Sequence, residues 1–208
     1  MKYLKKWRNI ITMTNKLKVK DFILIALLTA LYMVIYMLSM LLITPLGAFG
    51  HAISPGICAI FSGTVIYFMS EKLGKMWQFT IMTTLVMACF TLLGGGYIPW
   101  YITSIGMAII ADLLASKQGK DVKVIKVAIA SGIMHVGQAW GAIIPATFFL
   151  DRFKSYWVMK GQSAAELELH IKYTAGVWGL TSSIIVFILA VFGVYLGYFI
   201  LRKHFKES

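Results

Sequence analysis

The chain has 208 residues, of which 59% are hydrophobic and 13% charged, and its mean hydropathy is +0.79. A water-soluble fold of this size cannot bury so much apolar surface, so the composition excludes a soluble domain and favours one compact membrane domain in a lipid bilayer. The net charge of +12 would suggest a nucleic-acid partner in a soluble protein. Here the basic residues lie between apolar runs, so we expect no nucleic-acid partner.

Six apolar segments follow one another along the chain. A basic arm, 1–21, comes first and is too polar for a cleavable signal peptide. Each later run is close to the ~20 residues that a helix needs to cross a bilayer. We therefore predict an all-α membrane protein, a compact bundle of six transmembrane helices over 22–201, followed by a basic tail, 202–208. The runs lie at about 22–43, 47–70, 76–94, 97–115, 123–150 and 174–201.

The distribution of lysine and arginine predicts the orientation of this bundle. With six crossings both ends lie on one side, and the segments on that side carry 16 of the 20 basic residues. The positive-inside rule then places both termini of this multi-pass protein in the cytoplasm. The long connection 151–173 is therefore outside. Ser163 and Glu166 have capping-box spacing within it, which predicts a short interfacial helix.

Three pairs of small residues recur at helical spacing. Ala26 and Ala30 lie in the cytoplasmic half of the first helix, and glycine pairs lie at 137–141 and 193–197. Such steps leave a flat face on which another helix approaches closely. Taken alone, each pair favours packing within this protein, while a partner contact is the alternative for Ala26 and Ala30.

A run of three glycines, 94–96, precedes the helix expected at 97–115. Tyr97, Trp100, Tyr101 and Ser104 then follow helical spacing, so we expect them on one face. The amino-terminal end of this helix faces outside, where an anionic group can dock. An interfacial aromatic belt and a substrate-binding wall are both consistent with this pattern.

Polar residues also occur inside the apolar runs. His135 and Gln138 share a face near the middle of their helix, and we favour a pocket lining over a helix–helix hydrogen bond. Asp112 lies toward the cytoplasmic end of its helix. For Asp112 we favour a structural pairing with Lys117 and its neighbours over a proton relay.

Four further residues near the outer ends are candidates for substrate binding. Asp151 and Arg152 are placed to meet a solute arriving from outside, although they can equally form a solvated pair. His51 lies where the second helix begins. Trp178 flanks the long outer loop, where interfacial anchoring is the alternative.

Several common motifs are missing from the sequence. There is no Walker motif, no H-E-x-x-H and no G-x-S-x-G, so we expect no ATPase or hydrolase activity and no enzyme function. Cys58 and Cys89 lie in apolar runs, and no tight cluster of His, Asp and Cys suggests a metal site. We expect no cofactor.

Several stretches together resemble the Trep_Strep family, which is grouped with the substrate-binding S components of energy-coupling factor (ECF) transporters. The resemblance covers nearly the whole chain and depends on the order and spacing of individually weak motifs. These motifs are Lys18-Val19-Lys20-Asp21-Phe22, Ala26-xxx-Ala30-Leu31-Tyr32, Glu71-Lys72-Leu73-Gly74-Lys75, the glycine run at 94–96, Leu196-Gly197-Tyr198 and the basic end at 201–206.

This resemblance implies a six-helix subunit that binds a micronutrient from outside with high affinity. It also implies docking on a transmembrane T component that is joined to two cytoplasmic ATPases. The small-residue step on the first helix, here Ala26 and Ala30, would contact the T component. For this pair the resemblance therefore favours a partner contact over packing within the protein. Loops at about 44–50, 94–99 and 151–173 would gate the pocket.

The family does not identify the solute. A pocket with aromatic rings, His, Gln and an Asp–Arg pair suits a flat ring, so a vitamin or its precursor is the simplest candidate. Haem is the second candidate, because His51, Tyr97 or a Met can ligate iron. Two other functions stay open. One is a solitary carrier driven by an ion gradient through Asp112 and His135, and the other is an intramembrane enzyme, which the different depths of these two residues disfavour.

Overall fold

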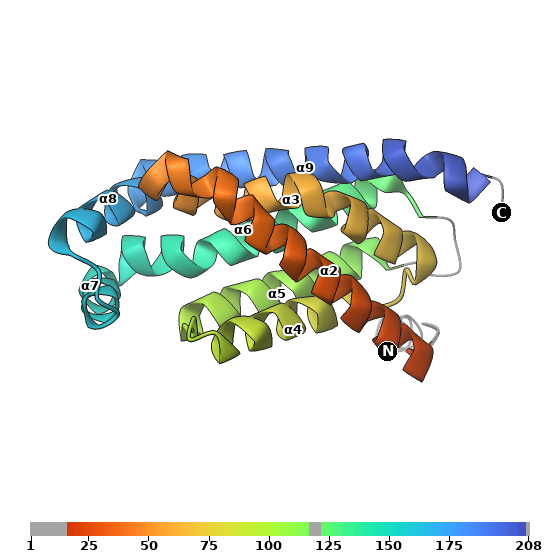
Figure 1. Ribbon diagram of the computed structural model, residues 1–208, viewed down its shortest axis with the longest axis horizontal. Coiled ribbons are helices and arrows are strands. Elements are labelled where there is room, and N and C mark those ends of the chain that lie inside the picture. Colours follow the sequence, from red (N-terminus) through yellow and green to blue (C-terminus); the bar gives the residue numbers. More distant parts are fainter. Residues whose placement is uncertain (1–15, 117–121, 207–208) are drawn as a thin grey trace, which may run out of the picture.

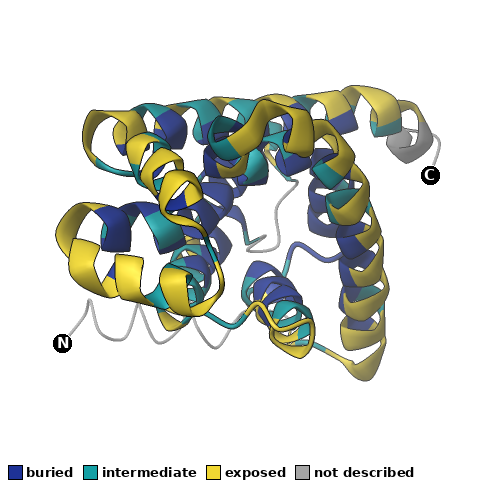
Figure 2. Cartoon of the chain, turned by 60° about the vertical axis from the view of Figure 1, so that its left-hand side comes forward, coloured by how far each residue is buried: buried dark blue, intermediate teal, exposed yellow. Residues whose placement is uncertain are grey.

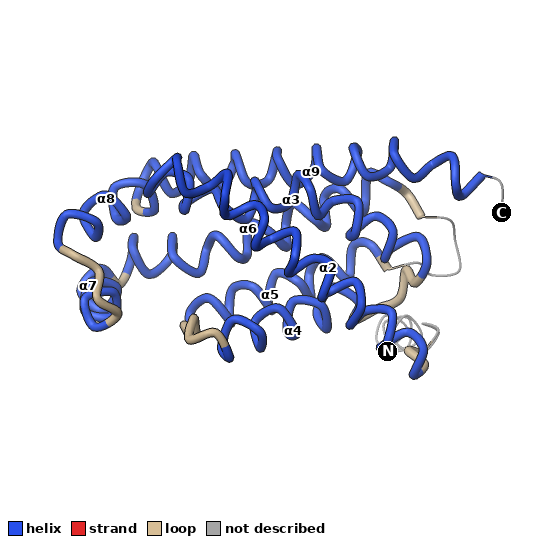
Figure 3. Tube along the Cα trace, viewed as in Figure 1, coloured by secondary structure: helices blue, strands red, loops and turns tan. Residues whose placement is uncertain are grey.

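The computed structural model describes residues 16–116 and 122–206, and within these ranges every regular element is helical (Figures 1 and 3). The all-α prediction is therefore confirmed. The elements are α2 (Val19–Ile43), η1 (Thr44–Leu46), α3 (Gly47–Lys72), α4 (Gln78–Leu92), α5 (Ile98–Ala115), α6 (Val124–Phe148), α7 (Leu150–Met159), α8 (Ala164–Thr174) and α9 (Gly176–Lys206).

Within the described residues, four segments are long and apolar enough to cross a membrane. The first, Val19–Lys72, contains α2 and α3, which one turn of 3-10 helix joins at the break expected near Pro45. The others are Ile98–Ala115, Val124–Phe148 and Gly176–Lys203, and α4 is a shorter apolar helix. All six predicted apolar runs are thus helical, within a few residues of the expected bounds.

The helix termini and the turns that connect the helices lie at two opposite ends of the molecule. In Figure 1, α2 begins and α9 ends at the right, whereas α7, α8 and the turn between α4 and α5 lie at the left. The helix α9 continues to Lys206, into the segment expected as a tail. Most of the predicted arm, residues 1–15, lies outside the described residues.

Close approach between helices depends on glycine. A Cβ at Gly193 would meet backbone atoms of Ala59 and Ile60 on α3, and one at Gly197 would meet the backbone of Thr64. On the other side of the bundle, Gly137 and Gly141 lie against side chains of α5. The structure therefore confirms that both glycine pairs pack against helices of the same chain. The central helix is α6, and α5 and α9 pack on it.

The outer surface of the bundle is apolar. Figure 2 shows exposed residues along the outward faces of the helices and buried residues on the faces turned inward. On α2, Leu27 is 64% exposed and Leu41 is 72% exposed, while Ile25 and Tyr32 are buried. A continuous apolar exterior of this kind is suited to lipid rather than water.

The expected long loop 151–173 is mostly helical, which corrects the prediction of one short helix. Two helices, α7 and α8, lie across the left end of the molecule and are joined by a short turn (Figures 1 and 3). The capping box is confirmed: the Ser163 amide donates to Glu166 Oε2 at 2.9 Å, and the Glu166 amide donates to Ser163 Oγ at 3.3 Å. The sequence pattern missed α7 because it is too polar for an apolar run.

Asp112 is fully buried and caps α4 from a neighbouring helix. The residue before α4, Trp77, has a φ of 76° and provides no side-chain cap. Asp112 instead accepts hydrogen bonds from the amides of Phe79 (3.0 Å) and Thr80 (2.8 Å), and from Thr80 Oγ1 (2.7 Å). A carboxylate at a helix amino terminus satisfies unpaired amides and favours the helix dipole. The expected partner, Lys117, lies outside the described residues.

Candidate solute-binding cavity

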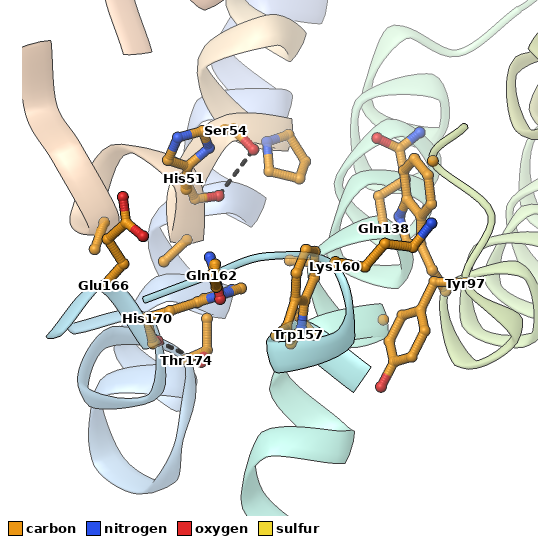
Figure 4. Close-up of a pocket in the computed structure, with 18 of the residues that line it drawn as sticks. His51, Ser54, Tyr97, Gln138, Trp157, Lys160, Gln162, Glu166, His170 and Thr174 are labelled. Atoms are coloured by element: carbon orange, nitrogen blue, oxygen red, sulfur yellow. Dashed lines mark hydrogen bonds between the residues drawn. The ribbon is translucent and has the colours of Figure 1, made fainter. Parts of the chain in front are cut away.

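A cavity of about 670 Å³ lies at the end of the bundle where α7 and α8 cross it. It is lined by the first half of α3, the glycine turn before α5, the first turn of α5, the second half of α6, and α7 and α8 (Figure 4). Cavities of roughly 300–1,000 Å³ are typical of sites for small molecules. The size and position therefore suit a small organic solute.

One side of the cavity carries small side chains. Ala48, Ala52 and Pro55 line it from α3, and Gly141 and Ala142 line it from α6. These residues project little from their helices, so the space between α3 and α6 stays open. Pro55 and Ala52 are themselves buried against the bundle, which fixes this wall.

Another part of the lining is built from aromatic rings. The ring centroids of Tyr97 and Tyr156 are 4.4 Å apart, and those of Tyr156 and Trp157 are 5.3 Å apart. Trp157 continues the cluster to His170 at 5.1 Å, and Trp100 also lines the cavity, from the first turn of α5. Aromatic faces of this kind bind flat rings by stacking.

The glycine turn is attached to α7 by two hydrogen bonds. The Tyr156 hydroxyl donates to the carbonyl of Gly96 at 2.7 Å, and Lys160 Nζ donates to the carbonyl of Gly94 at 3.1 Å. Gly94 has a φ of 85°, a conformation that favours glycine. The turn and α7 therefore close this side of the cavity together.

Polar groups line the part of the cavity below α3. His51, Gln162, Glu166 and His170 surround it, and Gln162 and His170 are within hydrogen-bonding distance at 3.4 Å (Figure 4). Burial, with a smaller contribution from the charge of His51, lowers the pKa of His170 to about 4. His170 is therefore neutral at physiological pH, and its ring packs against aromatic neighbours without a charge.

Gln138 connects the cavity to a buried polar chain inside the bundle. Its amide nitrogen donates to the Tyr32 hydroxyl at 3.5 Å, and that hydroxyl lies 3.2 Å from His135 Nε2. His135 Nδ1 in turn lies 2.8 Å from the carbonyl oxygen of Ser131. Tyr32 belongs to α2 and the other three residues to α6, so this chain joins the two helices.

The structure brings four of the predicted substrate-binding residues together. His51, Tyr97, Trp100 and Gln138 all line the cavity. The cavity residues that the sequence pattern did not single out come mainly from α7 and α8. Among them are Tyr36, Tyr156, Trp157, Lys160, Gln162 and His170, and Glu166 was expected only as a helix cap.

The other predicted substrate-binding residues lie outside the cavity lining. His135 is buried behind Gln138, and Ser104 is buried in α5. Tyr101 is hydrogen-bonded to Thr91, and Trp178 packs on Tyr173 with ring centroids 5.5 Å apart. The remaining two, Asp151 and Arg152, are exposed on α7, and no ion pair between them is present in the described part of the chain.

Two further expectations concern other surfaces. Ala26 and Ala30 are exposed on α2, so they do not pack against another described helix of this chain. No group of three or more His, Cys, Asp or Glu side chains arranged to hold a metal is found among residues 16–116 and 122–206.

Long apolar helices with exposed apolar side chains define an α-helical integral membrane protein. The comparisons with known proteins agree with this class. A family model described as a hypothetical bacterial integral membrane protein (Trep_Strep) matches residues 19–207, and the chain belongs to this family. No curated protein and no solved structure matches the chain.

Proposed function

We propose that this protein is the substrate-binding S component of an ECF-type ABC importer. In this proposal it binds a micronutrient from outside the cell and docks on a T component and two ATPases, which supply the energy for uptake. The observation that carries the proposal is the cavity of about 670 Å³, with its aromatic wall, at one end of an apolar helical bundle. The chain has no Walker motif, so ATP hydrolysis is assigned to its partners.

The proposed topology has six transmembrane helices, α2, α3, α4, α5, α6 and α9, with both ends in the cytoplasm. The start of α2 and the end of α9 lie at the same end of the molecule (Figure 1), as six crossings require. The excess of lysine and arginine at this end supports a cytoplasmic location in a bacterial plasma membrane. The cavity then opens toward the outside, where a solute arrives.

The exposed step on α2 supports a partner contact. Ala26 and Ala30 lie between larger exposed residues, among them Leu27 and Leu31. Small side chains at this spacing allow the backbone of a second helix to approach closely. We assign this face to the T component.

For the solute we propose a flat ring, as in an aromatic vitamin or its precursor. The Tyr97, Tyr156 and Trp157 rings offer stacking faces, while Gln138 and His51 offer hydrogen bonds. Haem is a second candidate, because His51 and Tyr97, two candidate iron ligands, both line the cavity.

The solitary-carrier alternative depends on Asp112 and His135 as ion sites. Asp112 is engaged by three donors at the start of α4, and His135 is engaged by Tyr32 and Ser131. Both side chains thus have structural partners, and they do not bond to each other. These contacts favour the S component over a carrier or an intramembrane enzyme.

Two measurements test the proposal. Native mass spectrometry of the purified protein should show a co-purified small molecule, and its mass separates haem from a smaller ring. The double substitution Ala26→Trp and Ala30→Trp should reduce co-purification of the T component and ATPases by at least about tenfold while solute binding is retained.

A matched control is Leu41→Trp, which places the same side chain farther along the exposed face of α2. It should leave co-purification unchanged. If the double variant also retains its partners fully, the docking face is elsewhere. If the wild-type protein neither retains a small molecule nor associates with ATPases, the proposed function is wrong.

A further inference from the structure

The hydrogen-bonded chain behind the cavity fixes the direction in which Gln138 presents its amide. His135 is buried among uncharged groups, so its ring is neutral and carries one N–H. The carbonyl oxygen of Ser131 can only accept, and it lies 2.8 Å from His135 Nδ1, so this nitrogen carries the hydrogen. The other nitrogen, Nε2, must then accept a hydrogen bond.

The Tyr32 hydroxyl is the donor to that nitrogen, at 3.2 Å. Because its hydrogen is used there, the hydroxyl oxygen can only accept from Gln138, whose amide nitrogen lies at 3.5 Å. The Nε2 group of Gln138 therefore faces Tyr32. Its Oε1 atom has no hydrogen-bond partner in the described ranges, although Gln138 is only 7% exposed and lines the cavity (Figure 4).

A second unpaired group lies on the aromatic wall. The Nε1–H of Trp157 is buried and has no acceptor among the residues that the structure describes. Trp157 also lines the cavity. Because this nitrogen is itself buried, the cavity offers a solute the ring of Trp157 and not its N–H.

We propose that the solute is a planar nitrogen heterocycle that stacks on the aromatic wall and donates an N–H to Gln138 Oε1. This inference rests on the proposed function and narrows its substrate class to amino-substituted or amide-like rings. A ring that presents only acceptors toward Gln138 is disfavoured, because the orientation of the amide is set by Tyr32. Tyr32 and His135 are thus positioning residues that determine specificity without touching the solute.

The test uses pairs of probes in which an amino group is replaced by a methyl group of similar size. Adenine is compared with the purine that carries methyl in place of its amino group, and an aminopyrimidine is compared with the corresponding methylpyrimidine. Dissociation constants are measured for the full-length protein in detergent. We expect the amino member of a bound pair to bind about tenfold more tightly, as one buried hydrogen bond allows.

Variants locate the preference at Gln138. Gln138→Met, which removes the amide, should abolish the amino preference. The matched control Gln162→Met alters a second cavity glutamine, whose amide is paired with His170, and should retain the preference. Tyr32→Phe releases the Gln138 amide to rotate, so it should reduce the preference while both probes still bind.

The inference is overturned if the methyl member binds as tightly as the amino member, or if the preference persists in Gln138→Met. It is also overturned if native mass spectrometry shows a co-purified solute without an N–H donor, a result that leaves the proposed function intact. If no probe binds and no small molecule co-purifies, the proposed function itself fails.

Discussion

Replacing Asp112 should destabilise the fold while leaving solute binding intact. Asp112 is fully buried and accepts from two backbone amides and one hydroxyl at the start of α4. With Asp112→Ala these three donors lose their acceptor inside the bundle. Each bond to a charged group contributes about 1.5–3 kcal/mol net, and such losses are not additive. We expect a total loss of about 3–5 kcal/mol, because each buried donor left without an acceptor costs about 1–3 kcal/mol.

Asp112→Asn should have a smaller effect, about 1–3 kcal/mol, because one oxygen still accepts while the new NH₂ faces donors of Thr80. The assay is the thermal unfolding midpoint of the purified protein in detergent, with binding of the co-purified solute measured in parallel. Asp151→Asn is the control, since Asp151 is exposed on α7, and it should leave the midpoint unchanged.

The reasoning would be refuted by an Asp112→Asn protein that unfolds at the wild-type temperature. If that protein also binds solute but no longer transports it, Asp112 is an ion-coupling residue and the solitary carrier is favoured. A lower midpoint with retained binding and transport in the assembled importer supports the capping role. The two functions proposed for this side chain are therefore separated by one pair of measurements.

Two further predictions concern the cavity. Tyr156→Phe removes the hydroxyl that donates to the carbonyl of Gly96 at 2.7 Å, so α7 should separate more readily from the glycine turn. Solute dissociation, measured in a chase experiment, should then be about 3- to 10-fold faster. An unchanged dissociation rate would mean that the solute does not leave past α7. The pKa of His170 is lowered to about 4, mainly by burial and further by His51, so the unfolded chain takes up a proton before the folded one as the pH falls. Stability should accordingly be full above pH ~6.5 and decrease from there toward pH ~4, as measured by unfolding midpoints, and His170→Phe should flatten this dependence; an equally steep decrease in that variant would assign the effect to another group.

The sequence predicted the fold well because the bilayer imposes a simple rule on composition. Every helix that faces lipid must be apolar over most of its length, so the runs near 22–43 and 174–201 correspond to α2 and α9 within a few residues. The connection at 94–96 was equally clear, since a glycine run between two apolar segments has no helical alternative. The glycine pair 193–197 was recognised as a packing step for a similar reason.

The same rule explains what the sequence did not predict. The helix α7 lies across the end of the bundle and contains Asp151, Arg152 and Lys154, so it has no apolar run to reveal it. Its contributions to the cavity, Tyr156 and Trp157, were therefore not among the expected substrate-binding residues. The role of Asp112 was also hidden, because the amides that it caps are more than 30 positions away in the sequence.

The candidate site shows why polar residues within membrane helices are hard to interpret one at a time. The sequence placed His135 and Gln138 on the same face of one helix, near the middle of the membrane, yet only Gln138 lines the cavity. His135 lies behind Gln138 and is connected to its amide through the Tyr32 hydroxyl. Tyr32 belongs to α2 and is more than 100 positions away in the sequence. Because α2 also carries the exposed Ala26 and Ala30, the helix assigned to partner binding contributes the hydroxyl that orients the cavity glutamine. In the proposed importer, a change in the tilt of α2 on docking would weaken the hydrogen bond between Gln138 and Tyr32, and with it the recognition of the solute.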